Sequence, residues 1–161
     1  MAFLFFAWYN FCMEDFNYVK WDAKFVIGIV PIDEQHKKLV ELCNALHEKV
    51  WTARKDDTDE WKVQTAVTLK ECVNYVATHF SYEEKIMKAV NYTNYPAHKK
   101  RHDEFTQKLL DVSSNFNNLT VKEALDFSKF LIDWIFEHIS YEDRLYVKPV
   151  QEYMKNSKIQ K

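Results

Sequence analysis

The scarcity of glycine is the feature that most limits how this chain can fold. Only one of its 161 residues is glycine, and three are proline. Sheets and tight hairpins depend on glycine at turns that need positive φ angles. The sequence therefore favours helices joined by short polar loops, and its length suits one domain with a sizeable core.

Composition argues against several classes of protein. Apolar residues make up 47% of the chain and aromatic residues 16%, which argues against disorder. The formal net charge is −2, so no large basic field indicates nucleic-acid binding. The three cysteines, Cys12, Cys43 and Cys72, are odd in number and widely spaced. This pattern predicts a reducing compartment and therefore a cytoplasmic protein.

The chain begins with an apolar segment, MAFLFFAWYNFC. The segment is shorter than the roughly 20 residues that span a bilayer, and it lacks the features of a signal peptide. We interpret residues 1–20 as an apolar arm or extension, 21–146 as the folded domain and 147–161 as a solvated tail broken by Pro149. We predict no membrane span and a monomer, and the sequence points to no particular protein partner.

Apolar residues recur at helical spacing in four segments. The predicted helices cover about 33–53, 59–89, 96–114 and 121–140. Asp33 is the expected N-cap of the first helix, Pro96 suits the start of the third, and Thr120 with Glu123 forms a capping box for the fourth. Short connections make successive helices antiparallel. The sequence thus predicts an all-α, up-down-up-down antiparallel four-helix bundle with an N-terminal arm.

Five of the six histidines converge at one end of this bundle. The start of the first helix, the end of the second, the start of the third and the end of the fourth all lie there. These positions hold His36, His79, His98, His102 and His138. The sixth, His47, lies roughly 16 Å further along the first helix than His36. We therefore expect His47 to have a structural or surface role.

Two carboxylates accompany these histidines. Glu83 follows His79 by four residues, so both side chains reach one point on one helix face, and His98 and His102 share that spacing. Asp143 follows His138 by five residues, which suits a common site if the helix ends there and Asp143 turns back. Glu84 points about 100° away from Glu83 and is expected to be a surface or supporting carboxylate.

Imidazoles and carboxylates together suit iron, zinc or manganese. Five imidazoles, two bridging carboxylates and one oxo or hydroxo bridge fill all but one of the positions around two octahedral ions. A single open position beside a redox-active pair is what O₂ binding requires. A tetrahedral zinc site uses four ligands and offers no redox chemistry. The residues therefore favour a di-iron centre.

Four segments carry these residues: WDAKFVIGIVPIDEQHKKL (Trp21–Leu39), HFSYEE (His79–Glu84), HKKRHDEF (His98–Phe105) and WIFEHISYED (Trp134–Asp143). In this combination and order they resemble the hemerythrin family, in its single-domain bacterial and muscle forms, over residues 21–146. The resemblance implies two iron ions as the cofactor. It also implies reversible O₂ binding for storage, transport or delivery, without enzymatic activity.

The resemblance also implies how the ligands divide. One iron would be held by His98, His102 and His138, and the other, which keeps the open position, by His36 and His79. Glu83 and Asp143 would bridge both ions.

The same resemblance implies an O₂ pocket beside the ligands. Its expected walls are Leu39, Phe80, Trp134, Tyr141 and Tyr146, although ordinary core packing would also explain such residues. Tyr141 departs from the family, which often has a smaller or aliphatic residue there. We predict that its phenol narrows the pocket or donates a hydrogen bond to O₂.

Two other functional classes stay open. One is a di-iron enzyme, either an oxidase or one that handles peroxide or nitric oxide. Ferritin-like di-iron enzymes use Glu-x-x-His pairs, which are absent from this sequence. The other is a sensor of O₂, iron or redox state, for which the few residues after Asp143 leave no room for a linked signalling domain.

Cys43 and Cys72 invite a separate interpretation. Cys43 follows His36 by seven residues, and Cys72 precedes His79 by seven. Both should therefore lie at one level of the bundle, as small core fillers or as a redox-sensitive thiol pair.

Overall fold

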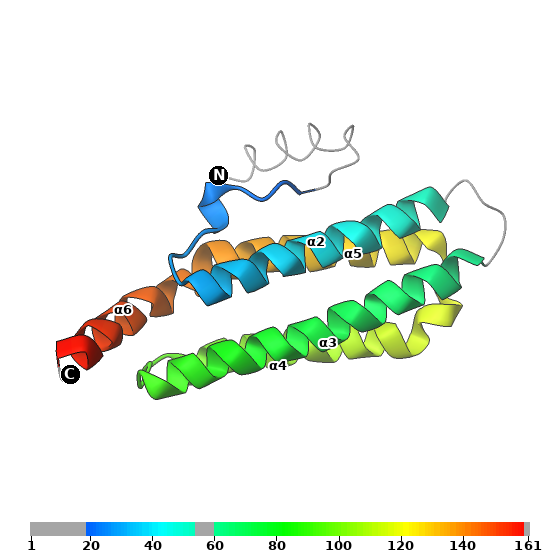
Figure 1. Cartoon of the computed structure of the whole chain (residues 1–161). Coiled ribbons are helices and arrows are strands. Elements are labelled where there is room, and N and C mark those ends of the chain that lie inside the picture. The colour runs from blue at the N-terminus through cyan, green and yellow to red at the C-terminus, as the bar shows by residue number, and fades with distance from the viewer. Residues whose placement is uncertain (1–18, 54–59, 160–161) are drawn as a thin grey trace, which may run out of the picture.

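The computed structural model describes residues 19–53 and 60–159. Four long helices run alongside one another: α2 (Val30–Ala53), α3 (Glu60–Ala89), α4 (Tyr95–Asn115) and α5 (Val121–Glu137) (Figure 1). Helix α2 packs against α3 and α5, and α3 packs against α4. Phe105 of α4 stacks on Trp134 of α5. The predicted up-down-up-down bundle is confirmed, while the expected N-terminal arm lies outside the described residues apart from its last two positions.

Shorter elements complete the described chain. They are the 3₁₀ helices η1 (Ala23–Phe25) and η2 (Phe116–Asn118), the π-helix η3 (His138–Glu142) and the helix α6 (Arg144–Ile159). Figure 1 shows α6 projecting beyond one end of the bundle. None of the helices in the described part of the chain is long and apolar enough to cross a membrane.

Pro149 lies inside α6, so the prediction that it breaks the tail was wrong. An interior proline costs a helix roughly 3 kcal/mol. Here Tyr146 and Val150, on either side of Pro149, are buried in one hydrophobic cluster with residues of α3 and of the segment before α2. Their burial offsets the proline and carries the helix across the expected boundary at residue 146.

Two helix starts follow the predicted signals. Pro96 lies in the first turn of α4. Thr120 and Glu123 form the capping box of α5, in which the Thr120 hydroxyl accepts a hydrogen bond from the Glu123 amide and the Glu123 carboxylate accepts one from the Thr120 amide.

The start of α2 differs from the prediction. The helix begins at Val30, and Asp33 lies in its first turn. The Asp33 carboxylate reaches back to accept hydrogen bonds from the amides of Ile27 (2.7 Å) and Gly28 (3.1 Å). Gly28 has φ +83°, a conformation that glycine adopts without strain. Asp33 is therefore not the N-cap, although it stabilises the same turn.

Two hydrophobic clusters lie at different levels of the bundle. The larger includes Leu39 and Phe80, and the smaller, at the end from which α6 projects, includes Ile32 and Met87. His36 on α2 and Glu83 on α3 lie between residues of the two clusters, and His79 lies next to Phe80 at the edge of the larger one. The fold thus seals the candidate site between two layers of apolar side chains.

Candidate metal centre

All seven predicted ligands meet in one buried cluster. None of their side chains is more than 2% exposed. They come from α2, α3, α4, η3 and the residue that follows η3. The members are His36, His79, Glu83, His98, His102, His138 and Asp143.

Three imidazoles form one half of this cluster. The Nε2 atom of His102 lies 3.1 Å from Nε2 of His98 and 3.0 Å from Nε2 of His138. It also lies 3.3 Å from Oε2 of Glu83. These four residues are close enough to hold one ion together.

Two imidazoles form the other half. The Nε2 atoms of His36 and His79 each lie 3.6 Å from an oxygen of Glu83. These three residues form a second group that could hold an ion. Glu83 is common to both groups.

Asp143 also faces both halves. Its Oδ2 lies 3.1 Å from Nε2 of His36, and its Oδ1 lies 3.1 Å from Nε2 of His138 and 3.4 Å from Nε2 of His98. Each carboxylate therefore contacts imidazoles of both groups, which is the arrangement that two bridged ions require.

The π-helix η3 explains how Asp143 reaches the cluster. In an α-helix, a residue five positions after His138 would point about 140° away from it. Here the Asp143 amide donates to the His138 carbonyl at 3.0 Å, an i to i+5 bond that returns Asp143 to the face of His138. The chain continues directly into α6, so the expectation that the helix ends there was wrong.

The same wide turn moves Tyr141 away from the site. Tyr141 is 65% exposed, so the prediction that its phenol narrows an O₂ pocket was wrong. Three residues after His138 would lie near the same face of an α-helix, but the π turn rotates this position outward.

Burial leaves several polar atoms of the cluster without a hydrogen-bond partner among the described residues. They are Nδ1 and Nε2 of His36, Nε2 of His79, Oε2 of Glu83, Nδ1 of His138 and both Asp143 oxygens. Nε2 of His36 and both Asp143 oxygens still lie 3.1 Å from an oppositely charged partner, whereas a buried polar atom with no partner at all costs about 1–3 kcal/mol. A pair of cations between these donors would satisfy most of them. Five imidazoles with two carboxylates are a donor set that iron accepts.

The imidazoles of the cluster differ in their protonation at pH 7. Burial lowers the pKa of His79 and of His98 to about 4, so both rings are neutral at pH 7. Burial also acts to lower the pKa of His36 and His138, but Asp143 and Glu83 outweigh it and raise these values to about 9 and about 10. Two imidazolium rings thus balance two carboxylates in the metal-free chain.

Two supporting residues orient ligand rings. Gln35 accepts from Nδ1 of His79 at 3.0 Å, and Glu84 accepts from Nδ1 of His102 at 3.4 Å. The expectation that Glu84 is a supporting carboxylate is consistent with this contact. Gln35 was not predicted, because its contact with His79 depends on how α2 packs on α3.

Aromatic rings cover the three-imidazole group. Phe80 stacks on the His102 ring at 3.7 Å between centroids, and Trp134 stacks on the His138 ring at 4.4 Å. The Tyr146 hydroxyl donates to Oε1 of Glu83 at 2.6 Å, and Leu39 is buried in the larger cluster.

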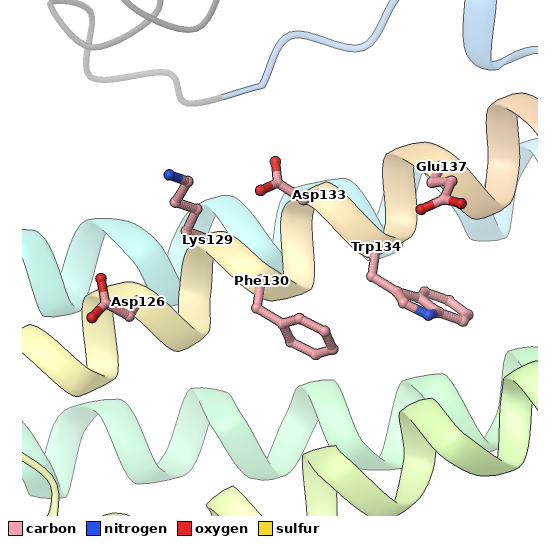
Figure 2. A pocket seen from close by; sticks show the side chains of 6 residues that line it. All are labelled: Asp126, Lys129, Phe130, Asp133, Trp134 and Glu137. Carbon is pink, nitrogen blue, oxygen red and sulfur yellow. The ribbon is translucent and has the colours of Figure 1, made fainter. Parts of the chain in front are cut away.

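A shallow groove runs along α5 outside this wall. It has a volume of about 350 Å³ and is lined by Asp126, Lys129, Phe130, Asp133, Trp134 and Glu137 (Figure 2). Phe130 and Trp134 point toward α3 and α4. Because Trp134 also stacks on His138, a single indole separates the groove from a candidate ligand.

The remaining candidates lie away from the cluster. Nδ1 of His47 lies 3.0 Å from the Ser128 hydroxyl, which agrees with a structural role. Cys43 and Cys72 are buried free thiols. Burial is the main cause that raises the pKa of both, so thiolate is scarce and the interpretation as core fillers is favoured. Cys12 lies outside the described residues.

Fold and site together define a helical-bundle protein with a buried cluster of imidazoles and carboxylates suited to binding cations. Residues 28–149 match the family described as Hemerythrin HHE cation binding domain. The chain belongs to the hemerythrin family.

Individual proteins agree with this assignment. The chain is 32% identical over 137 residues to a bacteriohemerythrin of Pseudomonas paraeruginosa, covering 83% of this chain and 82% of that protein. It is 33% identical over 126 residues to a hemerythrin-like protein of Naegleria gruberi, covering 78% and 88%. A solved structure of wild-type hemerythrin superposes with a TM-score of 0.70 at 27% identity, covering 82% and 97%.

Proposed function

We propose that the chain binds O₂ reversibly at a di-iron centre. The observation that carries this proposal is the pair of ligand groups that share Glu83 and that Asp143 contacts from the other side. A mononuclear site would not need a second set of imidazoles behind the same carboxylate. Membership of the hemerythrin family supports iron as the metal.

In this proposal, His98, His102 and His138 would hold one ion, and His36 and His79 would hold the other. Glu83 and Asp143, which face both groups, would be shared between the two ions. When bound, a di-iron pair supplies electrons to O₂ and recovers them on release. The position with two imidazoles has fewer protein ligands and is therefore the one that keeps room for O₂.

The surrounding residues suit reversible binding better than turnover. The ligands are no more than 2% exposed, and Phe80 and Trp134 stack on His102 and His138, which limits the access of water and protons. The Tyr146 hydroxyl donates a hydrogen bond to Oε1 of Glu83 and so stabilises the ionised carboxylate. Imidazole is an uncharged ligand, and five imidazoles favour reversible binding of O₂ over the oxidation of a substrate. We therefore infer that the protein is not an oxidase or a peroxide-handling enzyme. The free thiols Cys43 and Cys72 support a reducing, cytoplasmic location.

An absorption experiment tests this function. The iron-loaded protein is reduced without air, exposed to O₂ and then returned to an O₂-free atmosphere. A visible charge-transfer band that appears with O₂ and disappears on its removal is the expected result. Irreversible conversion to a ferric form would contradict reversible binding and favour the enzyme or sensor alternatives.

Metal analysis tests the ligand set. The wild-type chain should bind two irons, and a single zinc would contradict the proposal. His79→Ala should abolish dinuclear loading. His47→Ala, a histidine on the neighbouring helix outside the cluster, should not.

A further inference from the structure

One imidazole in each half of the site has a hydrogen-bond acceptor behind its ring, and the two acceptors differ. Nδ1 of His102 faces the Glu84 carboxylate, and Nδ1 of His79 faces the Gln35 amide oxygen. Both oxygens accept, so each ring donates its Nδ1 proton and directs the Nε2 lone pair into the site. The tautomer is the same in both halves, but the charge of the acceptor is not.

Glu84 is held in place as an acceptor. Its side chain is only 16% exposed. One carboxylate oxygen faces His102, and the other accepts from the Tyr95 hydroxyl at 3.2 Å. Glu84 lies on α3, whereas Tyr95 and His102 lie on α4. The carboxylate is therefore fixed between two helices. It lies on the Nδ1 side of the His102 ring, whereas Nε2 of the same ring faces the site.

We propose that Glu84 and Gln35 are positioning residues that make the two metal positions unequal. This inference rests on the proposed di-iron function. An anionic acceptor draws the Nδ1 proton and increases the electron density at Nε2, whereas a neutral amide does so less. The Glu84 contact is the longer of the two, but its acceptor carries a full negative charge.

Two consequences follow for the metals. His102 becomes the stronger donor, so the three-imidazole position holds its ion more tightly and favours the ferric state. His79 stays the weaker donor, so the position with room for O₂ holds its ion less tightly and is more easily reduced. Glu84 and Gln35 would thus make one ion tightly held and the other more easily reduced, although neither residue is a metal ligand.

The test changes only the charge of each acceptor. Metal-free full-length protein is titrated with Co²⁺ by calorimetry to obtain the affinities of the two binding steps. The midpoint potential of the iron-loaded protein is measured as a second readout. Glu84→Gln should weaken one binding step by roughly 10–100-fold and raise the midpoint potential. Gln35→Glu should strengthen the other step and lower the potential.

Glu104→Gln is the matched control. Glu104 is an exposed carboxylate of α4 that pairs with Lys100, so its neutralisation should leave both readouts unchanged. The inference is overturned if Glu84→Gln behaves like this control, or if Glu84→Gln and Gln35→Glu shift the potential in the same direction. If Glu84→Gln does not fold, the Gln35→Glu variant alone decides by the direction of its shifts.

The proposed function and this inference can fail separately. Wild-type protein that binds fewer than two Co²⁺ per chain would contradict the dinuclear site itself. Wild-type protein that binds two, with affinities insensitive to both substitutions, would contradict only the roles of Glu84 and Gln35.

Discussion

Tyr146→Phe isolates the contribution of one hydrogen bond to the site. The Tyr146 hydroxyl donates to Oε1 of Glu83 at 2.6 Å, and both side chains are 0% exposed. The substitution removes a single oxygen and keeps the ring in the smaller hydrophobic cluster. No apolar contact is lost, so the effect reports on the hydrogen bond.

The expected loss follows from burial and charge. A hydrogen bond to a charged group contributes about 1.5–3 kcal/mol, and a buried carboxylate oxygen without its donor keeps its desolvation penalty. We therefore expect the metal-free protein to lose about 2 kcal/mol in the free energy of unfolding. This corresponds to a roughly 30-fold change in the unfolding equilibrium.

Urea denaturation at neutral pH measures this change. Tyr153→Phe is the control, because Tyr153 lies on the same helix and is 50% exposed. It should change the free energy of unfolding by less than about 0.5 kcal/mol. If Tyr146→Phe stays within that same range, the hydrogen bond to Glu83 does not support the site as we infer.

The remaining predictions concern the spacing of His138 and Asp143 and the protons that the ligand cluster holds. Deleting Ser140, an exposed residue of η3, converts the five-residue spacing of His138 and Asp143 into the four-residue spacing of an α-helix, so Co²⁺ binding should persist. Deleting Glu137 in α5 rotates both His138 and Asp143 by about 100° and should abolish Co²⁺ binding. An equal loss of Co²⁺ binding in the two deletion variants would contradict this account. Metal binding at pH 7 should release the protons of His36 and His138, whose pKa values in the metal-free chain are about 9 and about 10. Calorimetry in buffers of different ionisation enthalpy measures this release, and buffer-independent heats would refute it. Because these pKa values are raised, the stabilisation that both histidines give the metal-free fold is complete below pH 6.5. It is lost as the pH rises through about 9 for His36 and about 10 for His138.

Helical periodicity made the bundle and most of the site predictable. His79 and Glu83, like His98 and His102, are four residues apart, and this spacing alone places each pair on one face. Short connections then determine which helix ends meet. These relations depend on local geometry, which the sequence encodes directly.

The misplaced residues depend on irregular backbone or on packing. The five-residue spacing of His138 and Asp143 signalled an irregular helix, but a helix end and a π turn satisfy it equally well. The resemblance placed Tyr141 beside the ligands, three residues after His138, whereas the π turn exposes it. Gln35 contacts His79 across two helices, so its role depends on the rotation of α2 against α3, which periodicity does not determine.

Asp33 was misplaced for a different reason. A carboxylate in the first turn can accept from amides before the helix, as an N-cap accepts from amides within it. The residue type therefore indicates a helix start without specifying its position.

The position of the site between two apolar clusters has a kinetic consequence. With the helices in place, an ion in solvent cannot reach ligands that are no more than 2% exposed, so uptake must wait for a local opening. The smaller cluster is the weaker barrier, because α6 supplies Tyr146 and Val150 to it and then extends beyond the bundle. Transient detachment of α6 would also carry Asp143 away and leave the site incomplete. The rates of metal exchange and of amide hydrogen exchange in α6 should therefore change together, because the same opening motion limits both.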